Sequence, residues 1–214
     1  MTERQKAQIS SRKQPKQARS NELVGSILQA ATQVLAKEGA QRFTTARVAE
    51  RAGVSIGSVY QYFPNKAAIL FRLQSDEWQQ TIDMLRKILD DSSKPPLDRL
   101  RALVHAFVRS ECDEAEMRVA LSDAAPLYRD APEAIEAKRE GEGIIANFMA
   151  EVLPNASEVQ RTLVGELIKD TLSAVGKQFS ESPRTVKAIK AYSDAMADMF
   201  CAYLERLQQQ NQVP

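Results

Sequence analysis

The sequence is poor in the residues that build disulfide frameworks and metal sites. Its 214 residues include two cysteines and one histidine. Cys112 and Cys201 lie far apart, and neither has a His or Cys partner at metal-ligand spacing. This pattern excludes a zinc finger and a disulfide framework, and it is typical of proteins in a reducing cytoplasm. We therefore expect no metal and no cofactor.

Long apolar segments are missing as well. No stretch approaches the roughly 18 consecutive apolar residues that a membrane span needs. The polar, basic start of the chain lacks the apolar core of a secretory signal. These absences predict a cytoplasmic protein that does not enter a membrane.

Side-chain sets that carry catalysis are also scarce. We find no Ser/His/Asp set, no glycine-rich phosphate loop and no convincing pair of carboxylates. The single histidine, His105, lies among apolar residues, where a core role is commoner than catalysis. The sequence therefore predicts a protein that is not an enzyme.

Only eight glycines and few β-branched runs favour helices over strands. We read residues 1–19 as a disordered basic arm, because they have almost no apolar residues and no period. The apolar spacing and the breakers predict helices over about 21–37, 45–51, 55–62, 66–89, 97–111, 114–127, 132–152, 157–180 and 185–208. The expected fold is all-α with about nine helices.

The near-neutral total charge hides an asymmetry between the two ends of the chain. Residues 1–66 hold 11 basic and four acidic residues, whereas the remainder holds 18 basic and 24 acidic residues. A basic head on an acidic body indicates that the head meets a polyanion, although basic tails on other proteins are common.

Two very short helices follow the first long one. Thr44 or Thr45 caps the first of them, Gly53 makes the turn, and Ser55 caps the second. Two short helices joined by a glycine-containing turn are typical of a helix-turn-helix. Pro64 then ends the unit, and Asn65 caps a helix of roughly 36 Å, which is long enough to span two domains.

Residues 43–70, FTTARVAERAGVSIGSVYQYFPNKAAIL, carry a denser pattern than this spacing alone. They resemble the N-terminal motif of the TetR/AcrR-type transcriptional regulators, over about 50–60 residues. The matching positions are Thr44, Thr45, Val48, Ala49, Ala52, Gly53, Val54, Ser55, Gly57, Ser58, Val59, Tyr60, Tyr62, Phe63, Asn65, Lys66 and Leu70. The resemblance implies an N-terminal three-helix DNA-binding domain, joined by a long helix to a helical-bundle effector and dimerisation domain.

The residues themselves are consistent with DNA binding. The Gln61 amide can pair with adenine, and Ile56 can touch a thymine methyl. Gly57 costs a helix about 1 kcal/mol relative to alanine, which a close approach of backbone to DNA would explain. The resemblance implies base contacts across residues 55–61 and phosphate contacts at Thr45, Tyr60, Tyr62 and Lys66. The full candidate set is Thr44, Thr45, Arg47, Ser55, Ile56, Gly57, Ser58, Tyr60, Gln61, Tyr62 and Lys66. The alternative is two capped helices of an ordinary bundle.

The remaining helices suggest two further sites. An effector pocket, as the family has, would be lined by Trp78, Met84, His105, Met117, Tyr128 and Phe148, although such residues are more often plain core. The apolar stripes of the last two helices are wider than one core requires, and in the family these helices pair across a two-fold axis. The candidate dimer residues are Leu163, Leu167, Leu172, Met196, Met199 and Tyr203. A purely internal core is the alternative.

The expected organisation is a DNA-binding domain over residues 20–80, with its motif at 44–63, and a ligand-binding and dimerisation domain over 81–210. The resemblance implies a transcriptional repressor that binds a palindromic operator as a homodimer and is released by a small-molecule effector. Such a protein would be cytoplasmic, and associated with the nucleoid when bound to DNA. The alternatives are an activating role and a chromosome-organising role on the same fold.

Overall fold

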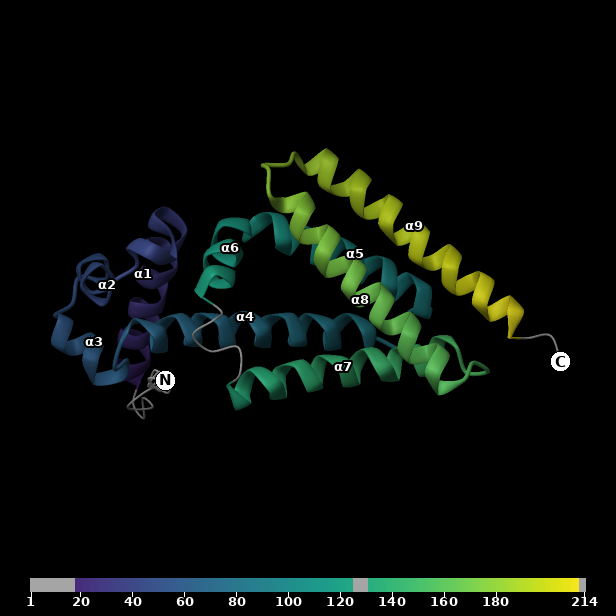
Figure 1. Ribbon diagram of the computed structural model, residues 1–214, viewed down its shortest axis with the longest axis horizontal. Helices are drawn as coiled ribbons and strands as arrows, with labels where there is room; N and C mark the ends of the chain where they lie inside the picture. The colour runs from purple at the N-terminus through teal and green to yellow at the C-terminus, as the bar shows by residue number, and fades with distance from the viewer. Residues whose placement is uncertain (1–17, 125–130, 212–214) are drawn as a thin grey trace, which may run out of the picture. The chain divides into compact units, whose positions relative to one another are not determined.

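The computed structural model describes residues 18–124 and 131–211, and over these residues it contains helices and no strand (Figure 1). This confirms the all-α prediction. The nine helices of the described residues are α1 (Ala18–Arg42), α2 (Thr45–Ala52), α3 (Ile56–Tyr62), α4 (Lys66–Leu89), α5 (Pro96–Asp113), α6 (Ala115–Ala124), α7 (Pro132–Val152), α8 (Glu158–Ser180) and α9 (Val186–Gln210).

Most predicted helix ends lie within a few residues of the observed ones, and the first helix differs most. Ala18 and Arg19, which we had assigned to the basic arm, are the first residues of α1, because both residue types favour helix. Residues 1–17 of that arm lie outside the described residues. Gly39, which follows the predicted end of this helix at residue 37, has φ 73° and ψ 169°, so the regular helix breaks there before Arg42.

The chain divides by its internal contacts into two compact units. The first contains the described residues of 18–78 and 116–135. Its core joins apolar side chains of α1, α2 and α3 with the first half of α4, and it includes Ala120, Leu121 and Ala124 of α6. Phe43 and Phe63 are among its fully buried side chains. This unit thus holds the helix-turn-helix segment on a core of its own.

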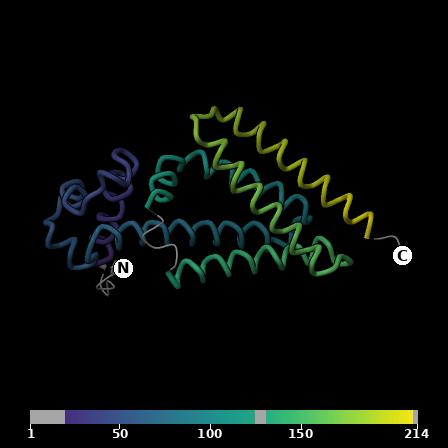
Figure 2. The backbone as a smooth tube through the Cα atoms, in the orientation of Figure 1, coloured from purple at the N-terminus to yellow at the C-terminus, as the bar shows by residue number. Residues whose placement is uncertain are grey.

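The second unit contains residues 79–115 and 136–211 of the described chain. Its core is built from the second half of α4 together with α5, α7, α8 and α9. Figure 2 shows the chain reversing between α8 and α9. At this turn the rings of Phe179 and Tyr192 stack at 3.9 Å, and the Arg184 guanidinium lies 4.5 Å from the Phe179 ring. The α8–α9 hairpin is therefore fixed by packing at its closed end.

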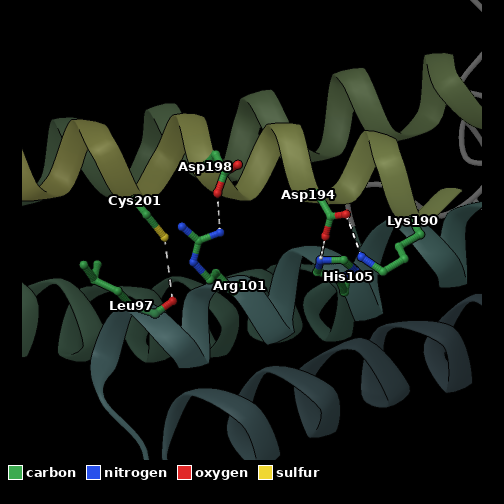
Figure 3. Close-up of polar contacts among 7 residues, drawn as sticks. All are labelled: Leu97, Arg101, His105, Lys190, Asp194, Asp198 and Cys201. Carbon is green, nitrogen blue, oxygen red and sulfur yellow. Dashed lines mark hydrogen bonds and ion pairs between the residues drawn. The ribbon is translucent and has the colours of Figure 1, made fainter. Parts of the chain in front are cut away.

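A row of polar contacts joins α5 to α9 (Figure 3). Arg101 pairs with Asp198, and Nε2 of His105 lies 3.0 Å from Oδ1 of Asp194. The Lys190 ammonium donates to the same carboxylate at 2.7 Å and lowers the pKa of Asp194, with a smaller contribution from His105. The sole histidine is thus a partner in an interhelical contact on the protein surface.

Arg99 anchors the end of α4 from inside the second unit. Its side chain is 3% exposed, donates to the carbonyl oxygen of Leu89, the last residue of α4, and pairs with Glu151 of α7. Since the last carbonyls of a helix lack partners within the helix, a buried guanidinium at this point satisfies one of them.

None of the described helices is long and apolar enough to cross a membrane.

Candidate nucleic-acid interface

The α2–α3 segment is held by caps that the sequence makes locally. The Thr44 side chain accepts a hydrogen bond from the Arg47 amide at 3.3 Å, at the start of α2. Gly53 ends α2 with φ 66° and ψ 29°, a left-handed conformation that suits glycine. Ser55 then caps α3 by accepting from the Ser58 amide at 3.0 Å. Gly53 and Ser55 therefore set the turn between the two helices, and Thr44 fixes the start of α2.

Two buried residues fix which face of α3 points outward. Val59 and Tyr62, three positions apart, are buried in the first unit's core. The opposite face is exposed, with Ile56 at 45% and Tyr60 at 40%. Gly57 and Gln61 lie on it too. The structure thus brings one apolar group, one phenol and one amide together on an open helix face with a glycine between them.

The start of α4 adds a positive charge beside a helix N-terminus. Asn65 accepts a hydrogen bond from the Ala68 amide at 2.9 Å, which caps the helix. Lys66, its first residue, is exposed and forms no ion pair with another described residue. A helix N-terminus with an exposed ammonium beside it is suited to binding a phosphate.

Several candidate DNA residues are less available than the sequence suggests. Tyr62 is 6% exposed and Thr45 is 8% exposed, so both contribute mainly to the core. For Tyr62 the helical period explains this, because it lies on the same face as Val59. The hydroxyl of Ser55 lies 2.8 Å from that of Ser58, so these two groups satisfy each other. Thr44 and Arg47 remain exposed.

Sequence reasoning missed the partners of the basic residues on α2. Arg47 pairs with Glu38 of α1, and the Nε atom of Arg51 donates to the Gln33 side chain at 2.6 Å. The signal available in the sequence was Glu38 itself, an acidic residue at a helix C-terminus, where the helix dipole disfavours negative charge.

The candidate pocket residues belong to different units. Trp78 and Met117 pack on the core of the first unit, whereas Met84 and Phe148 pack in that of the second. His105 takes part in the surface contact with Asp194. Tyr128 lies outside the described residues.

The candidate dimer residues also separate into two sets. Leu163, Leu167 and Met199 are at least half exposed, although they are large and apolar. By contrast, Leu172 and Met196 are buried in the second unit's own core, and Tyr203 is half-buried against it. Leu172 and Met196 thus contribute to the core of the second unit, and their assignment to a dimer interface stays a prediction.

Comparison with known proteins places these features in context. Residues 27–73 match the family model described as "Bacterial regulatory proteins, tetR family", and residues 95–207 match "Tetracyclin repressor-like, C-terminal domain". The chain is 40% identical over 83 residues to the nucleoid occlusion factor SlmA of Vibrio campbellii, covering 38% of this chain and 42% of that protein. It therefore spans well under half the length of that relative.

Solved structures share the fold at low sequence identity. FadR of Bacillus subtilis, solved in complex with stearoyl-CoA, superposes with a TM-score of 0.66 at 16% identity, covering 83% of this chain and 97% of FadR. NalD of Pseudomonas aeruginosa, the secondary repressor of the MexAB-OprM multidrug efflux pump, gives a TM-score of 0.58 at 17% identity, covering 88% and 97%. At such identities the likeness concerns the fold alone.

Gly57 provides a test that separates stability from DNA binding. A methyl group at this position would meet only the Ser55 hydroxyl, at 3.7 Å, so the fold has room for alanine. We expect Gly57→Ala to leave the melting temperature unchanged or to raise it, since alanine favours helix by up to about 1 kcal/mol. DNA affinity should nevertheless fall by about tenfold, because the added methyl group crowds the contact.

The matched control for this prediction is Gly143→Ala, an exposed helical glycine of α7 with open space around it. Thermal denaturation and fluorescence anisotropy on duplex DNA measure the two effects. Unchanged DNA affinity in Gly57→Ala would show that the backbone at Gly57 does not approach DNA.

Proposed function

Because the chain belongs to the TetR family of bacterial regulatory proteins, we propose that it is a ligand-responsive transcriptional repressor that binds a palindromic operator as a homodimer. The observation that carries the proposal is the open face of α3, with Ile56, Tyr60 and Gln61 exposed around Gly57. A short helix anchored by one side, with base-reading side chains on its exposed side, suits recognition of a major groove.

The exposed residues divide into base readers and phosphate ligands. Gln61 can form two hydrogen bonds with adenine, and Ile56 can contact a thymine methyl. Tyr60 and Thr44 offer hydroxyls to phosphates, and Lys66 offers an ammonium beside free amides. Base contacts set the sequence preference, whereas phosphate contacts set register and salt dependence.

The described residues lack any group of three or more His, Cys, Asp or Glu that could hold a metal. The proposal needs no catalytic group.

The homodimer is supported by the apolar side chains that α8 and α9 leave in water. Leu163, Leu167 and Met199 are exposed on two helices whose inner sides already fill the core. Exposed large apolar residues on both helices are the kind of surface that a second subunit would cover. A two-fold dimer presents two α3 helices to DNA, so its operator has two half-sites one helical turn, about 34–36 Å, apart.

Release by a small molecule is supported by the course of α4. Its first half, to Trp78, belongs to the first unit, and its second half belongs to the other unit, where Arg99 holds its last turn. An effector that binds the second unit and favours one orientation of α4 changes the spacing of the two α3 helices. Met84 and Phe148 are the candidate apolar contacts that we retain for it. FadR, which shares the fold, was solved with stearoyl-CoA.

A second candidate function is chromosome organisation, which the similarity to the nucleoid occlusion factor SlmA favours. Genome-wide mapping of binding sites separates the two. A regulator occupies one or a few promoters, whereas a chromosome-organising protein occupies many scattered sites. The position of the operator relative to its promoter then separates repression from activation. In each case we expect the protein in the cytoplasm, on the nucleoid when bound to DNA.

Gln61 and Lys66 test the DNA surface. Gln61→Ala should cost about 1–3 kcal/mol on the preferred operator, obtained by selection from random duplexes, and should relax base preference. Lys66→Ala should weaken binding to all sequences and flatten the salt slope by about one. Gln178→Ala and Lys187→Ala remove the same groups from exposed positions of the second unit and serve as controls. Parental affinity and slope in both test variants would contradict the assigned surface.

Leu167 and Met199 test the dimer. A glutamate at either position would place an unpaired charge in the interface, at a cost of several kcal/mol. Since both residues are at least half exposed in the subunit, we expect folded monomers by sedimentation and circular dichroism. Val119→Glu changes an equally exposed apolar residue of α6 and should leave the dimer intact. Intact dimers of all three variants would remove this face as the interface.

The effector mechanism is tested by a thermal-shift screen of apolar small molecules, with stearoyl-CoA as one probe. Each ligand that raises the melting temperature is then titrated against a protein–operator complex. We expect operator affinity to fall 5–150-fold at saturating ligand, which corresponds to a coupling of about 1–3 kcal/mol, and operator to weaken ligand binding by the same factor. Ligands that bind without changing operator affinity would refute the mechanism and leave DNA binding standing.

A further inference from the structure

The two arginines that α2 turns toward α1 are both bound by α1 side chains. Arg51 donates from Nε to the Gln33 amide oxygen at 2.6 Å. Arg47, one turn earlier and close to the start of α2, pairs through Nη1 with Oε2 of Glu38. An exposed arginine two residues after Thr45 is a natural phosphate ligand, yet the structure gives its guanidinium a carboxylate partner within the same unit.

Glu38 occupies a position that is unfavourable for an acidic residue. It is the last residue of the regular part of α1, immediately before the break at Gly39. Negative charge at a helix C-terminus opposes the helix dipole. Its Oε2 atom is shielded from solvent, although the side chain as a whole is 26% exposed. Arg47 is the cation that stands there.

The surroundings leave Arg47 room to move if that partner is removed. Both residues line a surface groove between α1 and α2, together with Gln33, Val34, Lys37, Glu50 and Arg51. The Arg47 side chain is 47% exposed, whereas that of Glu38 is 26% exposed. The arginine is thus held by its ion pair and not by burial in the core.

We propose that Glu38 is a positioning residue that withholds the Arg47 guanidinium from DNA phosphates. This inference rests on the proposed DNA-binding function and concerns the regulation of its affinity. Glu38 lies in the same unit as Arg47, so this ion pair needs no association step and competes with any DNA phosphate for the guanidinium. Arg47 therefore stays on Glu38 when DNA binds, and the complex makes one phosphate contact fewer in each subunit.

The test measures binding to a random-sequence pool of 40-base-pair duplexes between 50 and 250 mM NaCl, because phosphate contacts do not depend on sequence. Glu38→Gln keeps the shape of the side chain and removes its charge, and Glu38→Ala removes the acceptor as well. We expect both variants to bind about two- to fivefold more tightly at low salt. Their salt slope should steepen by about 0.9 for each freed arginine.

Two controls make the outcome specific. Glu50→Gln removes the same charge from the same groove at a residue that pairs with no other described residue, and it should leave the slope unchanged. Arg47→Ala should leave the slope of the parent unchanged, but should cancel the steeper slope when it is combined with Glu38→Gln. A purely structural role of Glu38 would lower the melting temperature and would not change the slope.

Binding by the parent tests the proposed DNA-binding function, whereas the salt slopes of the Glu38 variants test the role of Glu38. A parent that does not bind the duplex pool overturns the proposed DNA-binding function and this inference with it. A parent that binds, with the same slope in both Glu38 variants, overturns the inference alone. An equal change in slope for Glu38→Gln and Glu50→Gln also overturns it, because the effect would then reflect net charge and not the release of Arg47.

Discussion

The candidate interface depends on stabilising α3, a helix that is too short to be stable by itself. At seven residues, α3 is far shorter than the roughly 12–15 residues at which isolated helices become even marginally stable in water. Its stability therefore comes from burial of Val59 and Tyr62 and from the caps at its ends. The same constraint explains why Tyr62, whose residue type suits DNA, serves the core. In a helix of two turns, one side must pack against the core so that the other side can be presented to the bases.

The parts of the fold that local chemistry determines could be predicted from the sequence. Caps act within a few residues, so Thr44, Gly53 and Ser55 mark the ends of α2 and α3 without knowledge of the rest of the chain. The exposed face of α3 follows from the helical period once Val59 is assigned inward. Helix boundaries elsewhere follow from proline and glycine for the same reason.

The parts that depend on packing between helices could not be predicted. Apolar residues cover so much of α8 that its period does not say which side meets the subunit core. Leu172 is buried and Leu167 is half exposed, although both lie on one predicted stripe. The pair between Glu38 and Arg47 depends on how α1 and α2 approach each other across the break at Gly39. The sequence shows that Glu38 and Arg47 carry opposite charges, but it does not show that their side chains meet.

The α1–α2 contact also bears on how a short recognition helix achieves selectivity. Phosphate contacts strengthen binding to every sequence equally, and a genome offers roughly a million or more competing sites. A protein that reads few bases gains little from further phosphate contacts, because the additional affinity is shared by all the competitors. If Arg47 and Arg51 keep their α1 partners when DNA binds, as we propose for Arg47, a larger fraction of the binding free energy would come from the face that carries Gln61 and Ile56. On this proposal, the basic head attracts DNA through its overall charge, while few contacts fix its position on DNA.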